Sequence, residues 1–521
     1  MRSSPNRDPE VLEFLGRLAE ADSGPQGAAP YRGGEVTRLN TQWQPDHYAP
    51  DSAVAEGWDL LTRRILDLQR NDPVMIALRR TLVDHVVATG LMTTANVMIA
   101  GELEEDFNAQ ADDEFDWWAE NEADFSGKLA WPEIQRQAFA ELLDTGAALL
   151  LRCQENAAGR TVPLCYQTLL AEQLDESKDW PAGRGRNKCV RGIEVDRFDR
   201  PVAYWLFDAH PGDAYASTYA SEPISASRVI HITSPGRPGQ IHGISLYSAI
   251  TQTAWDLDNY LGSELTAANI GALFSLIHKT ASPTSGFGFA GDGSDTATTD
   301  VYGNPKVRLG RGIVCQIPRE DDIEQVQANR PNAQAKVFTD LMMMLLAMGG
   351  NVSTYRLTRD YRSTTYVAAR AARLDDAAAF APLQGFLGRQ LCLQVRHDWT
   401  AQAVAFGVLD SVSPGIYRKN RRRWDRLLLQ PPGIPQIDME KETDADIAAI
   451  GAGFETLESV GSRRGKPWRK VILQRKREIE FERKHLGPLG VELSYDRPST
   501  PGKRASDDVP APAPGNGPED E

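Results

Sequence analysis

The sequence lacks the short motifs that identify the commonest classes of enzyme and metalloprotein. No GxxxxGK(S/T), GxSxG, HExxH or CxxC pattern occurs in its 521 residues, so a P-loop ATPase, a nucleophile elbow, a zinc protease and a zinc ribbon are not supported. A literal GxGxxG does occur at Gly286, Gly288 and Gly291. A dinucleotide site needs a strand before this motif and a helix after it. Here a predicted helix precedes it and loop residues follow, so we interpret it as a surface loop.

Cysteine and long apolar runs are also scarce. Five cysteines are scattered along the chain, at Cys153, Cys165, Cys189, Cys315 and Cys392, which is typical of buried free thiols in a reducing cytoplasm. The eight histidines form no pair at ligand spacing, so we expect neither a metal nor a cofactor. The longest clean apolar runs fall far short of the roughly 20 residues of a membrane span. The first ten residues hold no apolar segment, so no secretory signal is expected.

Positive charge is in deficit, and both signs are unevenly distributed. The formal net charge is −15, which argues against a general nucleic-acid binder because phosphates would be repelled. Residues 101–124 hold eleven acidic and no basic side chains, which is usual for a solvated helix face. Residues 238–277 contain no Lys or Arg, although Asp256, Asp258 and Glu264 are present. Basic residues concentrate in 418–426, which is either a nucleic-acid patch or a solvated or protein-facing surface that balances the acidic remainder.

Hydrophobic periodicity predicts an α+β protein of several regions, because this length exceeds one hydrophobic core. Asp72-Pro73 predicts the start of a helix and Gly90 its end. Short β-like runs lie between residues 162 and 232, and a Gly/Thr/Asp-rich stretch with two strand-like runs spans 282–317. Helices are expected at 58–90, 131–151, 243–277 and 332–348, at 363–402 with a kink at Pro382, and as a pair within 440–486.

The polar segment 351–362 carries Arg356, Arg359 and Arg362 beside the Gly349-Gly350 helix stop. Three arginines in a short loop suit either transient phosphate contact or salt bridges between subunits. The residues alone therefore indicate a structural assembly component better than an enzyme, since no catalytic constellation is visible.

Several strings, taken together and in order, resemble the lambda-type family of tailed-phage portal proteins. Ser227–Ser245, SRVIHITSPGRPGQIHGIS, is similar to that family's most recognisable segment, and Gly192–Pro211 resembles its hairpin ending in HP. Four further strings match the family in the same order along the chain: Leu66–Gly90, Phe115–Trp131, Thr354–Leu374 and Glu440–Leu486.

The resemblance implies the portal fold, a ring-forming α+β architecture with wing, stem, clip and crown regions. On this chain it implies an N-terminal arm at 1–55, a wing at 56–240, a first stem helix at 241–281, a clip at 282–328, a second stem helix at 329–350, a tunnel loop at 351–362, a kinked wing helix with its connection at 363–439, a helical crown at 440–487 and a disordered tail at 488–521.

The resemblance also implies function and partners. A homo-dodecamer would sit at one vertex of the virion capsid, after assembly in the host cytoplasm, and conduct double-stranded DNA during packaging and ejection. Its partners would be the large terminase subunit, major capsid and scaffold proteins, and head-completion or connector proteins. Arg356, Arg359 and Arg362 would contact DNA, and Asp256, Asp258 and Glu264 would line the channel. Another phage head component is the first alternative, and a carboxylate-based hydrolase is the second.

Overall fold

The computed structural model describes residues 38, 41–43, 45–156, 159–215, 220–234, 236–273, 335–362, 364–433 and 438–485, together with four strands between 276 and 318. The glycine motif at 286–291, most of the predicted arm and clip, and the predicted tail lie outside these residues.

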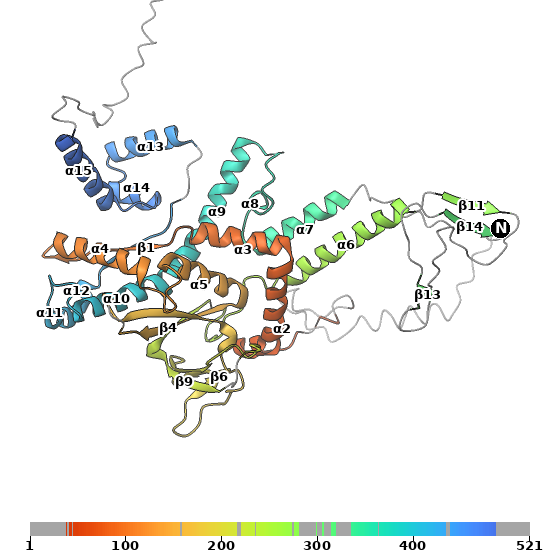
Figure 1. The fold of residues 1–521 in the computed structure, drawn as a ribbon, viewed down its shortest axis with the longest axis horizontal. Coiled ribbons are helices and arrows are strands. Elements are labelled where there is room, and N and C mark those ends of the chain that lie inside the picture. The colour runs from red at the N-terminus through yellow and green to blue at the C-terminus, as the bar shows by residue number, and fades with distance from the viewer. Residues whose placement is uncertain are drawn as a thin grey trace, which may run out of the picture.

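Two helices open the described chain, α2 (Pro50–Asn71) and α3 (Pro73–Val86) (Figure 1). The predicted boundary between them is confirmed: the Asp72 carboxylate accepts a hydrogen bond from the Met75 backbone N–H at 2.6 Å, and Pro73 takes the first helical position. Helix α2 begins inside the predicted arm. Helix α3 ends at Val86 rather than at Gly90, which lies in the turn that follows.

The acidic run forms helix α4 (Glu105–Asn121), which follows the short strands β1 (Met92–Ala95), β2 (Met98–Ile99) and β3 (Glu102–Leu103). Helix α5 (Trp131–Thr145) is shorter than predicted, because residues 147–151 belong to strand β4 (Ala147–Gln154). Gly146 ends the helix with a φ of 89°. A Cβ atom there would overlap the backbone of Ile244, so only glycine fits at this approach.

The predicted β-rich middle is confirmed and forms two antiparallel sheets. Strand β4 lies between β10 (Val229–Thr233) and β5 (Leu164–Leu169). The second sheet has the order β6-β7-β8-β9. Its strands are β6 (Lys188–Val190), β7 (Ile193–Val195), β8 (Pro201–Phe207) and β9 (Ser221–Ser225), and 3₁₀ turns lie at Ala171–Gln173 and Ala226–Arg228.

The main core joins helices α3, α4 and α5 to the β4 sheet and to the helices near residue 400. Trp118 and Trp399 are fully buried in it, and Phe115 packs edge-on against Trp399 with ring centroids 5.2 Å apart. Four cysteines, Cys153, Cys165, Cys189 and Cys392, are buried free thiols as expected. The side chain of Cys315 lies outside the described residues.

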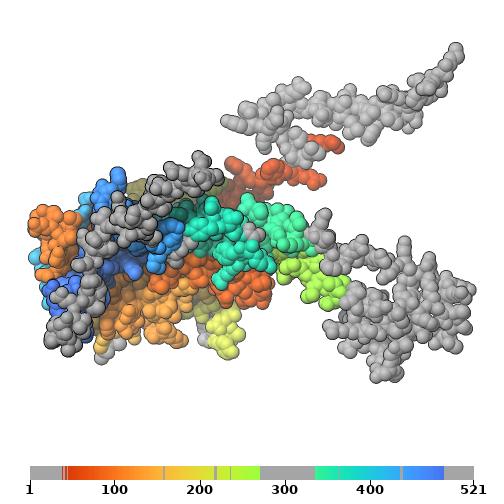
Figure 2. All heavy atoms as spheres, turned by 90° about the horizontal axis from the view of Figure 1, so that it is seen from above, coloured from red at the N-terminus to blue at the C-terminus, as the bar shows by residue number. Residues whose placement is uncertain are grey.

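Two helices leave this body side by side, α6 (Thr251–Leu273) and α7 (Ala335–Gly349) (Figures 1 and 2). The rings of Tyr260 and Phe338 join them at 4.6 Å. The single helix predicted over 243–277 was too long. Residues 243–245 are irregular and 246–250 form a turn, and 276–280 form strand β11 (Leu276–Thr280), which pairs in parallel with β14 (Val314–Pro318). Strands β12 (Thr298–Thr299) and β13 (Pro305–Lys306) form a further antiparallel pair.

After α8 (Thr354–Thr358), a long helix crosses the body as three consecutive segments. These are α9 (Tyr366–Leu387), a π turn at Gly388–Cys392 and α10 (Leu393–Ala405). Pro382 lies inside α9, and the π turn follows it. A side chain at Gly388 would overlap Leu429, so the helix and this neighbouring segment approach closely.

The C-terminal part returns to the body and then leaves it. Short helices α11 (Pro414–Lys419) and α12 (Arg421–Trp424) lead into β15 (Leu427–Gln430), which pairs with β1. Beyond them lie α13 (Met439–Gly451), α14 (Leu457–Arg463) and α15 (Trp468–His485). The segment 440–486 therefore holds three helices where two were predicted, because Gly453 and Gly465 adopt positive φ and separate them.

Candidate functional site

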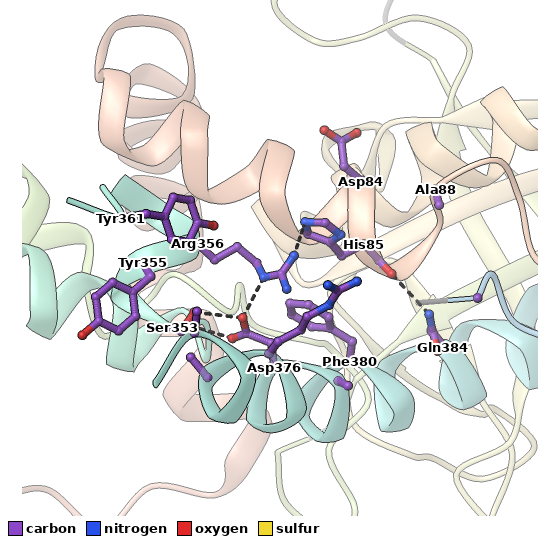
Figure 3. Close-up of a pocket in the computed structure, with 15 residues that line it drawn as sticks. Asp84, His85, Ala88, Ser353, Tyr355, Arg356, Tyr361, Asp376, Phe380 and Gln384 are labelled. Carbon is purple, nitrogen blue, oxygen red and sulfur yellow. Dashed lines mark hydrogen bonds and ion pairs between the residues drawn. The ribbon is translucent and has the colours of Figure 1, made fainter. Parts of the chain in front are cut away.

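Arg356 lies on the short helix α8, in the segment for which the sequence predicted a loop. Its Nε donates to Asp376 Oδ2 at 2.7 Å, and the side chain of Asp376 is 4% exposed. Asp376 also accepts hydrogen bonds from the backbone N–H of Ser353 at 2.7 Å and from its hydroxyl at 2.8 Å (Figure 3). Three donors therefore converge on one buried carboxylate, which fixes α8 to α9.

His85 of helix α3 completes this contact from the other side. Arg356 Nη1 lies 2.6 Å from His85 Nε2, and the imidazole stacks on Phe380 with centroids 5.8 Å apart and planes at 7°. Burial and the neighbouring Arg356 guanidinium both lower the pKa of His85. A neutral imidazole can accept from Arg356, whereas a protonated one would repel it. Arg356 therefore joins three helices.

A cavity of about 480 Å³ opens beside this contact, between α3, α8 and α9 (Figure 3). Small residues such as Ala88, Ala372 and Ala377 leave the space, and Arg373 lies in its wall. Burial and the nearby Arg356 lower the pKa of Arg373. Two guanidinium groups thus share the cavity wall, which suits contact with an anionic group.

Arg359 and Arg362 lie elsewhere on the segment, and both are exposed. Arg359 caps helix α8 in the left-handed region, with a φ of 54°. Arg362 forms an ion pair with Asp360 at 2.7 Å, and its side chain is 88% exposed. The three predicted arginines are therefore not equivalent: Arg356 is an anchor, Arg359 is exposed, and Arg362 is exposed with its charge paired to Asp360.

The three predicted acidic residues share helix α6. Asp256 and Asp258 are exposed, and Glu264 is half-buried. Asp256 accepts a hydrogen bond from Gln252 at 2.9 Å. Asp258 lies close enough to Asp72 to raise the pKa of that carboxyl, although burial is the larger cause. Two of the three carboxylates are thus open to the outside of this helix in the single chain.

Sequence reasoning missed the partners of Arg356, which are Asp376, Ser353 and His85. A signal for Asp376 was present. Asp376 precedes Phe380 and Gln384 by one and two helical turns, and all three residues are buried on the same face of α9. His85 could not be paired with Arg356 in advance, because 271 residues separate them.

Within the described part of the chain, no group of three or more His, Cys, Asp or Glu side chains is arranged to hold a metal ion. The helices described here also include none that is both long and apolar enough to cross a membrane.

Comparison with known proteins gives consistent matches. Residues 36–384 match the family described as phage portal protein, lambda family. The probable portal protein of Halomonas phage phiHAP-1 is 23% identical over 473 residues, covering 88% of this chain and 87% of that protein. Portal protein B of Escherichia phage lambda is 21% identical over 471 residues, covering 85% and 88% respectively.

Among solved structures, a chain from the virion of a native gene transfer agent particle is similar at 13% identity. The match covers 78% of this chain and 94% of that one, with a TM-score of 0.39. That score is too low for the two folds to be equated, so the family assignment depends on the sequence matches.

Proposed function

This chain belongs to the lambda family of phage portal proteins, and on that premise we propose that it forms a dodecameric ring that conducts viral DNA through one capsid vertex. The family is structural and non-enzymatic, and its members are virion components. The hydrolase alternative is therefore wrong, and the matches favour a portal over another head component.

The observation that carries the ring proposal is the exposed apolar surface of helix α7. Val337 and Met348 are each 69% exposed, and the side chains between them on the same helix include Leu341, Met344 and Leu345 at 44–51%. A contiguous apolar surface on a projecting helix is unfavourable in water and marks a protein contact. Neighbouring copies in a ring would cover it.

The same pair of helices suits the stem of a channel. Helix α6 contains no Lys or Arg, and it exposes Asp256 and Asp258. An acidic wall repels phosphates within about a Debye length of 8 Å, so DNA can slide without binding. Under this proposal, α6 and α7 are the stem, strands β12–β14 belong to the clip, 56–240 and 363–439 form the wing, and the helices from residue 440 onward form the crown.

We propose that segment 351–362 is the tunnel loop and that Arg359 and Arg362 contact the DNA backbone. Arg356 supports this role indirectly, because its bonds to Asp376 and His85 hold the base of the segment. Phosphate contacts of this kind carry no sequence information. The motor would be a separate terminase subunit, since this chain has no P-loop, and capsid, scaffold and head-completion proteins would surround the ring.

The first test is the oligomeric state of the purified full chain. Native mass spectrometry should show rings of about twelve subunits, and electron microscopy should show a central channel. As a control, Leu341→Glu with Met344→Glu places charge on the exposed face of α7 and should reduce ring formation without unfolding the body. Only monomers and dimers of the unaltered protein would contradict the proposal.

A second test separates the arginines. Arg359→Ala with Arg362→Ala should lower the yield of packaged genomes while rings still form, because both side chains are exposed. The matched variant Arg356→Ala should also reduce thermal stability, because it leaves the Asp376 carboxylate short of a partner. An unchanged packaged-genome yield in the double variant would remove the DNA role of the loop.

A further inference from the structure

Helices α4, α11 and α12 lie at the end of the body away from α6 and α7 (Figure 1), and they carry two surfaces of opposite charge. The basic surface lies on α11, α12 and the residue before β15, and consists of Arg418, Lys419, Arg422, Arg423 and Arg426, all exposed. Arg421 forms an ion pair with Asp425, but none of the other five cations does so with any side chain in the described part of the chain. The buried rings of Tyr417 and Trp424 fix both helices to the body, so these charges are held in place.

The acidic surface lies on helix α4 and consists of Glu105, Asp106, Asp113, Asp116 and Glu120, again all exposed. The opposite face of the helix is buried through Phe107, Ala111, Phe115 and Trp118, which fixes the direction of the acids. Glu105 and Asp106 suit the positive end of the helix dipole, but Glu120 lies at the negative end. Asp113, Asp116 and Glu120 also repel one another at spacings of three and four residues.

One contact shows that this helix already accepts basic side chains. Lys470 of α15 forms an ion pair with Asp116, and the neighbouring Arg469 donates to Asn96 Oδ1 at 2.8 Å. That contact neutralises only one acid of the surface. The remainder is unfavourable in a single chain and would be relieved by a second basic segment.

The two surfaces belong to neighbouring helices yet do not neutralise each other. The rings of Phe107 on α4 and Trp424 on α12 are 4.9 Å apart, but no ion pair links the acidic and basic surfaces within the described chain. In a closed ring of identical subunits, each interface joins two different faces of the chain. A chain that carries the two signs on two separate surfaces is suited to such head-to-tail contact.

We propose that the basic surface of one subunit pairs with the acidic surface of the next. This inference rests on the proposed ring. A nucleic acid fits the basic surface less well, because the net charge of the chain is −15 and opposes the approach of phosphates. The contact would be sensitive to salt, since every charge in it is exposed.

Charge reversal and its rescue test this pairing in the full chain. One variant reverses three basic residues, by Arg418→Glu, Arg422→Glu and Arg423→Glu. A second reverses three acids, by Asp106→Lys, Asp113→Lys and Glu120→Lys. Each should raise the subunit concentration at half-assembly by about tenfold at low salt, as measured by mass photometry. The chain that carries all six changes should assemble like the unaltered protein.

The matched control reverses three exposed arginines in the segments beside the second sheet, by Arg184→Glu, Arg197→Glu and Arg200→Glu, and should leave assembly unchanged. Thermal unfolding of each variant shows whether its body is intact. Failure of the sixfold variant to recover, or normal assembly of both threefold variants, overturns the pairing while leaving the ring proposal standing. Normal rings with weakened duplex DNA binding in the basic variant would overturn it in favour of a DNA surface. If the unaltered chain forms no ring at all, it is the proposed function that fails.

Discussion

The body and the helices at its periphery are stabilised in different ways. In the body, Trp118, Trp399 and Tyr166 are almost fully buried in one apolar cluster. Helices α13 and α15 bury no residue, and α14 buries only Val460. Phe454 in the turn after α13 is 88% exposed. Within the described residues, the body therefore has a closed apolar core, whereas the peripheral helices leave apolar side chains exposed.

The largest effect should come from the body. Trp399→Ala removes a fully buried ring that packs against Phe115, and we expect a loss of about 4 kcal/mol in the free energy of unfolding. Phe454→Ala in the peripheral region should change that free energy by less than about 0.5 kcal/mol. Urea unfolding of the dissociated chain measures both. Equal losses would show that the two regions share one core.

The next effect concerns a buried ion pair within the body. Arg396 is 0% exposed and donates to Asp112 at 2.7 Å. Burial lowers the pKa of Arg396 and raises that of Asp112, whereas the opposite charge of the partner favours the charged form of each group. Asp112→Asn should cost about 3 kcal/mol of unfolding free energy.

Two further sets of variants test whether the cost of Asp112→Asn comes from a buried unpaired charge. Asp59→Asn breaks an exposed pair with Arg63 and should cost less than about 1 kcal/mol. The double change Asp112→Leu with Arg396→Met should cost less than Asp112→Asn alone, because it leaves no buried charge unpaired. A larger cost for the double variant would mean that the pair itself stabilises the body.

The last predicted effect is a dependence on pH. Burial raises the pKa of Glu141 to about 7, and that of the neighbouring Asp144 to about 6. An unfolded glutamate titrates near 4.3, so between about pH 4.5 and 7 the native state binds the extra proton. Stability therefore falls as the pH rises through this window.

Glu141→Gln removes this contribution. The variant should match the unaltered protein near pH 4 and exceed its unfolding free energy by about 3 kcal/mol at pH 8. Denaturant unfolding across the pH range checks it. The peripheral control is Glu455→Gln, because the hydrogen bond from Arg463 lowers the pKa of Glu455 and gives a slope of opposite sign. A variant without any gain at pH 8 would contradict the burial argument.

Local signals predicted local structure well. Asp72-Pro73 marks the start of α3, and the alternating turns between 162 and 232 mark the strands. The errors came where local signals are ambiguous. The apolar run Ala147–Leu151 fits a buried helix or a buried strand equally, and the left-handed Gly146 decides in favour of the strand.

The candidate site was only partly predictable for a related reason. The family and the three arginines could be found from the sequence, but their different roles depend on distant partners. Arg356 meets His85 across 271 residues, and Arg396 meets Asp112 across 284. Periodicity within one helix cannot reveal which carboxylate of another helix will face it.

The glycine contact at the base of helix α6 has a mechanical consequence. The backbone of Gly146 touches the segment 243–244, and a Cβ atom on Gly243 would overlap the carbonyl of Gly146. The Ser245 hydroxyl also donates a hydrogen bond to the carbonyl of Leu143 at 2.7 Å. The residues that lead into α6 are therefore packed against the body and hydrogen-bonded to it, and do not form a loose linker. Through these contacts, a force that tilts α6 is transmitted directly to α5 and strand β4. A movement at the projecting end of α6 therefore acts on the core of the body.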